Sequence, residues 1–256
     1  MSLKLKGSFG PITGAMKFSK PGPVINVDQT DLILYHDYSQ TECYPGTNTI
    51  VNNLIGNVPG ALEGSPLPTF HPATDSFYYG GSGTPNIKPN SIFAVPVNTF
   101  TFSIWCKPSQ STYIPGQTTS GINQLSGWRK LCTGGDGSGT NTGFELSVGT
   151  NGIAVIEHKA STHFSPITRS ISISSTNWTN IVITYTNGIP NLYINGAWIK
   201  TGAQGSGSTA MGLTSIGYGS YGSFAGNITM ISAYSRALDG TDVLSNYDAD
   251  KTRYGH

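Results

Sequence analysis

Two groups of side chains in this 256-residue sequence could do chemistry, its carboxylates and the aromatic residues of its glycine-rich stretches. The glutamates are Glu42, Glu63, Glu145 and Glu157, and hydrolysis of a glycosidic bond needs two carboxylates that face each other. Glu145 and Glu157 fall on neighbouring predicted strands and could approach each other, but a solvated or structural pair is favoured. No alternating Glu-x-Asp-x-Glu run and no Gly-x-Ser-x-Gly motif is present. We therefore expect no catalytic residues and no enzymatic activity.

The aromatic residues that lie in or beside glycine-rich loops are Tyr113, Trp128, Tyr218 and Tyr221. Recognition of a sugar needs an aromatic ring for its apolar face and polar neighbours for its hydroxyls. Binding residues also tend to lie on loops, so these four are the candidate glycan-binding residues, with ordinary loop packing as the alternative. Trp105, Trp178 and Trp198 lie on or beside predicted strands, where a core or interface role is favoured.

Composition limits the partners of the chain. Charged residues make up 11% of it and the net charge is +1, without the basic stripe of a nucleic-acid surface. No apolar run approaches the ~20 residues that span a bilayer, and the N-terminus lacks the apolar segment of a signal peptide. We expect neither nucleic-acid binding nor membrane insertion. Cys43, Cys106 and Cys132 are odd in number and widely spaced, which predicts free buried thiols.

The candidate carboxylates and aromatic residues must be positioned by β-strands, which the sequence indicates by alternation of apolar and polar residues. Asn98 to Lys107 alternates apolar residues with Thr and Ser, so one of its faces belongs against a second sheet. Residues 177–200 read as three antiparallel strands, the last two joined at Asn195-Gly196 by a two-residue loop typical of a type I′ turn. A short helix is predicted to start at Asp239. Further strands are expected at 31–38, 129–133, 144–148, 153–159, 169–174, 214–218 and 226–234, with short strands near 61–62 and 76–79.

Five segments, in order and spacing, resemble the laminin G-like, concanavalin A-like lectin/glucanase jelly-roll family. They are Asn98 to Pro108, Asn177 to Tyr185, Leu192 to Gly196, Ser215-Ile216-Gly217 with Phe224 to Ile228, and Tyr234 to Leu238. The resemblance implies an all-β fold, a two-sheet antiparallel jelly-roll sandwich with a short C-terminal helix. This domain would occupy 23–256, and residues 1–22 would form an N-terminal arm.

The same resemblance implies calcium, the family's common cofactor, bound by loop oxygens. Asp37, Asp75 and Asp136 are the residues at which this sequence would supply them. Two features depart from the family's pattern. The segment Tyr78 to Gly83, which follows Asp75, contains no carboxylate. In the last strand, Thr229 replaces the acidic residue that often follows Gly-x-Ile in the family.

The resemblance is strongest, in overall style, to versions of the fold found in virion proteins of tailed phages. The leading hypothesis is a non-enzymatic virion protein, on a capsid or tail surface, for decoration or for adhesion to host-surface glycans. Its partners would be other virion proteins, cell-surface polysaccharide and further copies of itself, since virion appendages occupy symmetric sites. A soluble carbohydrate-binding module outside any virus is the second hypothesis, and a polysaccharide hydrolase is the third.

Overall fold

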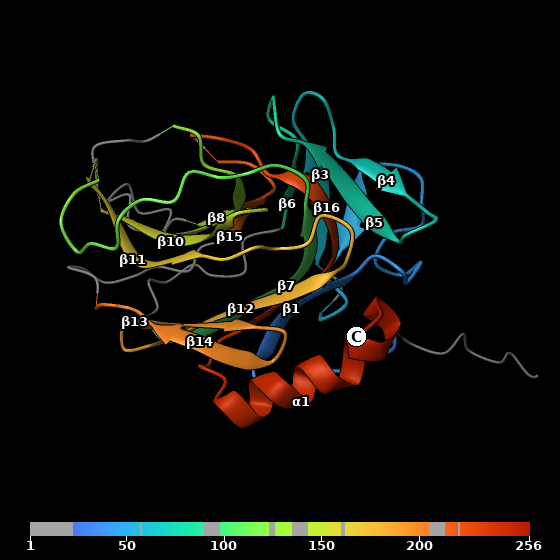
Figure 1. Cartoon of the computed structure of the whole chain (residues 1–256). Coiled ribbons are helices and arrows are strands. Elements are labelled where there is room, and N and C mark those ends of the chain that lie inside the picture. Colours follow the sequence, from blue (N-terminus) through green and yellow to red (C-terminus); the bar gives the residue numbers. More distant parts are fainter. Residues whose placement is uncertain are drawn as a thin grey trace, which may run out of the picture.

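Two antiparallel sheets, here called sheet A and sheet B, pack face to face (Figure 1). The computed structural model describes residues 23–56, 58–89, 98–122, 126–134, 143–159, 162–204, 213–219 and 221–256. Sheet A contains β1 (Leu32–Asp37), β4 (Thr69–His71), β5 (Ser76–Gly80), β7 (Phe100–Pro108), β12 (Thr179–Thr186), β13 (Ile189–Ile194), β14 (Ala197–Thr201) and β16 (Ala225–Tyr234). Sheet B contains β2 (Ile50–Asn52), β3 (Pro59–Glu63), β6 (Asn86–Lys88), β8 (Lys130–Gly134), β9 (Gly143–Gly149), β10 (Gly152–Lys159), β11 (Thr162–Ser170) and β15 (Leu213–Ile216).

Strand order follows from long-range pairing. Sheet A runs β14-β13-β12-β7-β16-β5-β4 with β1 beside β16, and sheet B runs β11-β10-β9-β8-β15-β6-β3-β2. The first and last strands of the chain therefore pair, and every strand pairing among the described residues is antiparallel. This arrangement confirms the predicted all-β sandwich with two antiparallel sheets.

The core lies between the sheets and is rich in aromatic residues. Phe100 and Phe102 of β7 point at Phe144 of β9, with ring centroids 5.6 and 6.2 Å apart. Tyr185 stacks on Phe100 at 4.6 Å. The apolar face predicted for residues 98–107 is thus confirmed as the face turned toward the second sheet. The three cysteines are buried and free, as predicted.

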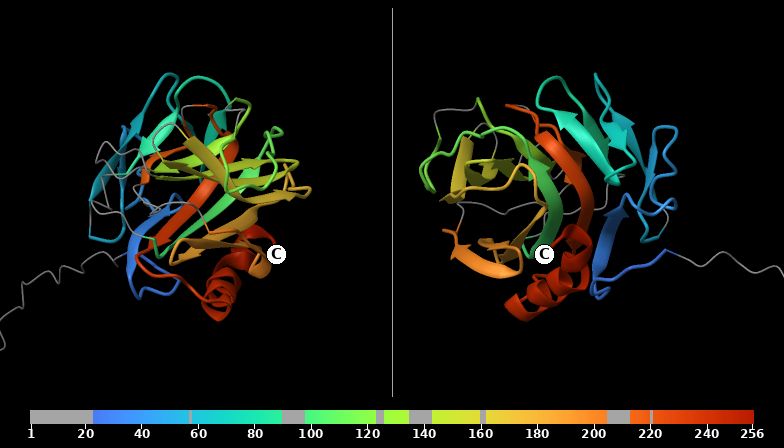
Figure 2. Two further views of the ribbon diagram at one scale, coloured as in Figure 1. Left: turned by 90° about the vertical axis from the view of Figure 1, so that its left-hand side faces the viewer. Right: turned by 45° about the vertical axis from the view of Figure 1, so that its right-hand side comes forward.

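The C-terminal segment covers the outer face of sheet A. Helix α1 (Gly240–Asp250) begins at Asp239, whose side chain accepts hydrogen bonds from the backbone N–H groups of Thr241 and Asp242 in a capping box. Figure 2 shows the red helix against the orange strands β13 and β14, with the yellow strands of sheet B beyond them. Trp105 of β7 packs there against Tyr254 of the 3-10 helix η1 (Lys251–Tyr254), with ring centroids 4.2 Å apart.

The predicted meander of residues 177–200 is confirmed as β12, β13 and β14. Asn195 and Gly196 both have positive φ, 50° and 76°, as a type I′ turn requires. One strand was placed wrongly. Alternation predicted a strand at 169–174, whereas β11 spans Thr162–Ser170. It ends there because its partner β10 begins at Gly152, which lies opposite Ser170.

Candidate functional site

The outer face of sheet B, turned away from sheet A, holds a buried ion pair. Lys130 of β8 and Glu145 of the neighbouring β9 form a salt bridge between Nζ and Oε2, and their side chains are 0% and 7% exposed. Burial lowers the pKa of Lys130 below its ordinary value, because the charged amine is taken out of water, and the Glu145 carboxylate opposes part of that change. Because both charged groups are buried, neither can exchange its partner for water, and the salt bridge holds the two side chains in one arrangement.

Two aromatic rings enclose the lysine. The Nζ atom of Lys130 lies 5.0 Å from the ring centroid of Trp128 and 4.9 Å from that of Tyr221. Both distances are within the range of cation–π attraction. Trp128 is fully buried, whereas Tyr221 is 37% exposed. We name Trp128, Lys130, Glu145, His163 and Tyr221 the Tyr221 site, of which Tyr221 is the most exposed member.

The local sequence explains how Tyr221 reaches the lysine. The described residues 217–219 and 221–224 lie over β8, and this close approach depends on two glycines. A Cβ at Gly219 would lie 2.3 Å from Cδ of Lys130, and a Cβ at Gly222 would lie 1.9 Å from the carbonyl oxygen of Trp128. Gly222 also has a φ of +150°, a conformation that costs side-chain-bearing residues energy. Only glycine lets the backbone come close enough to place the Tyr221 ring over Lys130.

A loop from the other side completes the wall. The backbone N–H of Ile122 donates to the carbonyl of His163 at 2.8 Å, so the loop follows β11. Tyr113 packs with Ile122 against Trp128 and its neighbours on the outer face of β10. The His163 ring lies 5.3 Å from the Tyr221 ring, at an interplanar angle of 85°. An aromatic face, imidazole edges and a buried charge pair therefore meet at one place.

The structure brings together three of the four aromatic residues that were predicted to bind glycans. Tyr113 and Tyr221 have ring centroids 6.4 and 6.1 Å from that of Trp128. Trp128 offers no exposed ring face and instead supports Lys130 and Tyr221 from below. Tyr218 lies in the described segment 217–219, half buried, and its carbonyl accepts a hydrogen bond from the Thr133 hydroxyl at 3.3 Å.

Sequence reasoning missed Lys130 and His163. Lys130 had a signal, because it follows Trp128 closely in a predicted strand and directly precedes the apolar pair Leu131-Cys132. An unpaired lysine is rarely buried, so such a position calls for an acidic partner on a neighbouring strand. His163 had no signal, because its position opposite Tyr221 arises from the packing of β11 beside β10 and of residues 221–224 over β8.

Glu145 and Glu157 do not form a catalytic pair. Glu145 pairs in register with Ile156 of β10, and Glu157 pairs with Phe144. Neighbouring residues of a strand point to opposite faces, so Glu145 lies on the outer face and Glu157 between the sheets. There Glu157 Oε1 accepts a hydrogen bond from the Tyr185 hydroxyl at 2.8 Å, and burial raises the pKa of Glu157 to about 7.

Of the three residues expected to hold calcium, Asp37 and Asp75 lie in the described part of the chain. Both Asp37 oxygens accept hydrogen bonds from the Arg253 guanidinium, at 2.6 and 2.8 Å. Burial works against ionisation of Asp37, yet the bonds from Arg253 keep its pKa below the ordinary value. Asp37 is therefore paired with a cation of the chain itself, and its role as a calcium ligand stays a prediction. Asp75 is exposed, and among the described residues no group of three or more His, Cys, Asp or Glu side chains could hold a metal ion. Asp136 lies outside the described residues.

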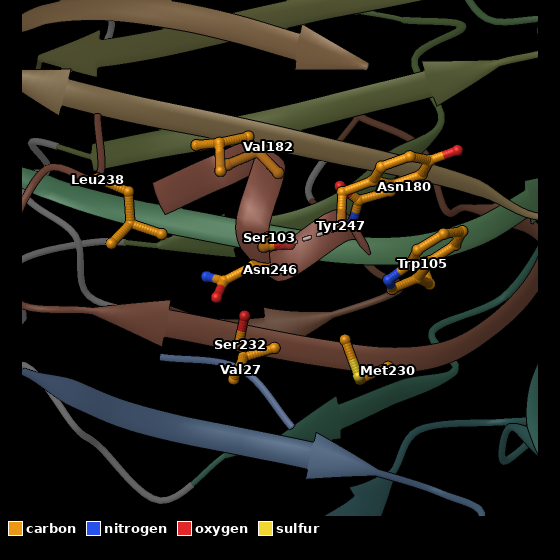
Figure 3. A pocket seen from close by; sticks show the side chains of 11 residues that line it. Val27, Ser103, Trp105, Asn180, Val182, Met230, Ser232, Leu238, Asn246 and Tyr247 are labelled. Carbon is orange, nitrogen blue, oxygen red and sulfur yellow. Dashed lines mark hydrogen bonds between the residues drawn. The ribbon is translucent and has the colours of Figure 1, made fainter. Parts of the chain in front are cut away.

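A cavity beneath α1 is too small for a ligand. Figure 3 shows residues that line it, among them Asn246 and Tyr247 of the helix and Ser103, Trp105 and Asn180 of sheet A. The cavity volume is about 10 Å³, enough for about one water molecule. The Asn180 amide donates to the Ser103 hydroxyl at 3.2 Å. This cavity belongs to the packing of the helix on the sheet.

Residues 80–244 match the family model described as the concanavalin A-like lectin/glucanases superfamily. The chain belongs to that superfamily, as the resemblance implied. None of the curated proteins compared matches it. None of the described helices is long and apolar enough to cross a membrane.

Among solved structures, the fold is similar to domain 4 of AbnA, an extracellular arabinanase from Geobacillus stearothermophilus, in complex with arabinotriose. That likeness has 18% identity and a TM-score of 0.51 and covers 86% of this chain and all of that one. The receptor-binding domain of botulinum neurotoxin type G is similar at 18% identity and a TM-score of 0.58, over 86% of this chain and 51% of that one. Trypanosoma rangeli sialidase in complex with sialic acid is similar at 14% identity and a TM-score of 0.55, over 93% of this chain and 36% of that one. The chain thus spans about half of the toxin domain and a third of the sialidase, and these likenesses concern the fold.

Proposed function

We propose that this chain is a non-enzymatic carbohydrate-binding protein and that the Tyr221 site binds the glycan. The observation that carries the proposal is that Trp128 and Tyr221 enclose a buried lysine on the outer face of sheet B, with Tyr113 beside Trp128. A sugar ring has an apolar face that packs on an aromatic ring and hydroxyls that need hydrogen-bonding partners. Tyr221 supplies the ring and His163 supplies a polar edge beside it.

The lysine fixes the ring before a ligand arrives. Lys130 attracts the faces of both rings, and Glu145 holds the lysine in place. The Tyr221 ring therefore has little rotational freedom to lose when a sugar packs on it, and this preorganisation favours binding. Fold likeness to a module solved with arabinotriose supports the same class of ligand.

Binding is favoured over hydrolysis by the placement of the carboxylates. Glu145 is neutralised by Lys130, and Glu157 lies on the other side of the sheet. Retaining and inverting glycosidases need two carboxyl groups about 5–10 Å apart across the sugar. Depolymerase activity in the wild-type protein that is lost in Glu145→Gln would reverse this assignment.

The test compares two exposed aromatic residues. Tyr221→Ala removes the proposed binding face, whereas Trp198→Ala removes a 59% exposed tryptophan from β14 of sheet A. A glycan array identifies a ligand, and calorimetry then measures its Kd for each variant. We expect Tyr221→Ala to weaken binding about tenfold or more, the equivalent of about 1.4 kcal/mol, and Trp198→Ala to leave Kd unchanged. Failure of the wild type to bind any glycan would refute the proposal.

We further propose that the protein acts on a virion, on a capsid or tail surface, as a decoration or adhesion protein. Low charge and a short lysine-containing N-terminal stretch support this role, and residues 1–22 or a sheet face would attach it to other virion proteins as a symmetric oligomer. Mass spectrometry of purified particles tests this location. If the protein is absent from the particles, the virion role is refuted and the hypothesis of a soluble carbohydrate-binding module remains. Deletion of residues 1–22 should abolish particle attachment, and unchanged attachment would rule out the arm as the anchor.

A further inference from the structure

A second cleft lies at the end of the sandwich where the chain crosses from β11 of sheet B to β12 of sheet A. Its volume is about 320 Å³, within the size range of small-ligand sites. The backbone N–H of Ile173 donates to the carbonyl of Thr150 at 3.0 Å, which places the crossing beside the hairpin that begins β10. The His158 ring lies 5.8 Å from that of His163 of the Tyr221 site. His158 is six residues along β10 from Gly152, the first residue of that strand, which corresponds to about 20 Å at about 3.3 Å per residue. The two sites are therefore separate.

The floor of the cleft is apolar and one wall is an aromatic ring held in place. Ile171, Ile173 and Ile194 contribute to the lining and pack against the main core. Trp178 is half-buried, with Lys107 Nζ 4.4 Å from its ring centroid and Tyr254 edge-on at 5.9 Å. A ring fixed in this way loses little entropy when a ligand packs against it.

The rim is polar and is set by local hydrogen bonds. The Ser174 hydroxyl accepts from the backbone N–H groups of Thr176 at 3.2 Å and Asn177 at 2.9 Å. This turn presents the exposed Asn177 side chain at the mouth of the cleft. On the facing side, Asn195 Oδ1 accepts from the backbone N–H of Asn180 at 2.9 Å, which fixes its carboxamide against the wall.

The charge of the lining defines the ligand. Among the described residues that line the cleft, none is Asp, Glu, Lys or Arg, and His256 is the titratable one. An apolar floor, a fixed indole and a rim of amides and hydroxyls suit a molecule with one apolar face and several uncharged hydroxyls. We propose that this cleft binds a neutral sugar residue, as a second site in addition to the Tyr221 site. Two sites on one module would raise the avidity for a polysaccharide that reaches both.

The experiment uses the indole N–H signals of the ¹⁵N-labelled full chain. The four tryptophans are Trp105, Trp128, Trp178 and Trp198, and substitution of each by Phe assigns its signal. Glucose, galactose, mannose, N-acetylglucosamine and arabinotriose are the neutral probes, and glucuronate is the charged one. We expect a saturable shift of the Trp178 signal with at least one neutral sugar and a weaker response to glucuronate.

Two variants separate this cleft from the Tyr221 site. Asn177→Ala changes an exposed side chain and should preserve the fold, which the dispersion of the other indole signals checks. We expect it to weaken sugar binding at Trp178 about tenfold, as for the loss of one good hydrogen bond, while Tyr221→Ala leaves the Trp178 titration unchanged. The proposal is overturned if no neutral sugar moves the Trp178 signal up to tens of millimolar, if Asn177→Ala leaves Kd unchanged, or if glucuronate binds more tightly. If Tyr221→Ala abolishes the sugar-dependent shift of the Trp128 signal and leaves that of the Trp178 signal, the lost binding belongs to the Tyr221 site and the two sites are separate.

Discussion

Glu157 should make the stability of this protein fall as pH rises from about 4.5 to about 7. Its carboxyl lies between the two sheets, and burial raises its pKa from an ordinary 4.5 to about 7. A carboxyl whose folded pKa lies above its unfolded value stabilises the fold fully below pH 4.5. That contribution declines as pH rises and is lost above about 7. The difference is worth about 3 kcal/mol at about 1.4 kcal/mol per pH unit.

Glu157→Gln isolates this effect, because glutamine resembles the protonated acid in shape and can still accept from Tyr185. Urea unfolding of both proteins between pH 5 and pH 8 gives the free energy of unfolding at each pH. We expect the variant to gain about 2–3 kcal/mol relative to the wild type across that interval. Any constant offset from the new amide group cancels in the comparison. If the difference between the two proteins does not change with pH, Glu157 is ionised at little cost and the burial argument is wrong.

Two further substitutions test how the chain is held together. Gly222→Ala should lower the free energy of unfolding by about 3 kcal/mol, because the new Cβ meets a backbone carbonyl at 1.9 Å. Gly188→Ala, at φ +81° in open space, should cost about 1 kcal/mol, and equal costs would contradict the close-approach argument. Asp37→Asn leaves the Arg253 guanidinium without its charged partner and should cost about 3 kcal/mol in urea unfolding. The exposed Asp75→Asn is its control and should stay within about 0.5 kcal/mol; a similar small loss in both would show that the ion pair contributes little.

Local pattern was sufficient for elements whose residues alternate over a long stretch. The strand at 98–107 could be assigned with its core face, because alternating apolar residues leave one arrangement against a second sheet. The turn at Asn195-Gly196 and the helix start at Asp239 were also local, since each depends on the backbone conformation of neighbouring residues. The short strands β2, β4 and β6 have too few residues for a periodic signal. They form because partners distant in the sequence supply their hydrogen bonds.

The candidate site was predictable in part. The types of its aromatic residues and their glycine-rich setting marked Tyr113, Trp128 and Tyr221. Which ring faces solvent was not predictable, because the burial of Trp128 depends on segments that pack over it from both sides. The ion pair of Lys130 with Glu145 depends in the same way on the register between β8 and β9.

The sequence by itself determined the class of fold, the family and the kinds of side chain available for binding. These follow from period, turn chemistry and composition, which act between neighbours along the chain. The tertiary structure decided which of those side chains meet, as the two glutamates show. Their spacing left open whether Glu145 and Glu157 face each other, and the pairing of Glu145 with Ile156 put them on opposite sides of sheet B. Register between strands is set by the packing of whole faces, so only the folded chain could assign one carboxylate to the surface and the other to the core.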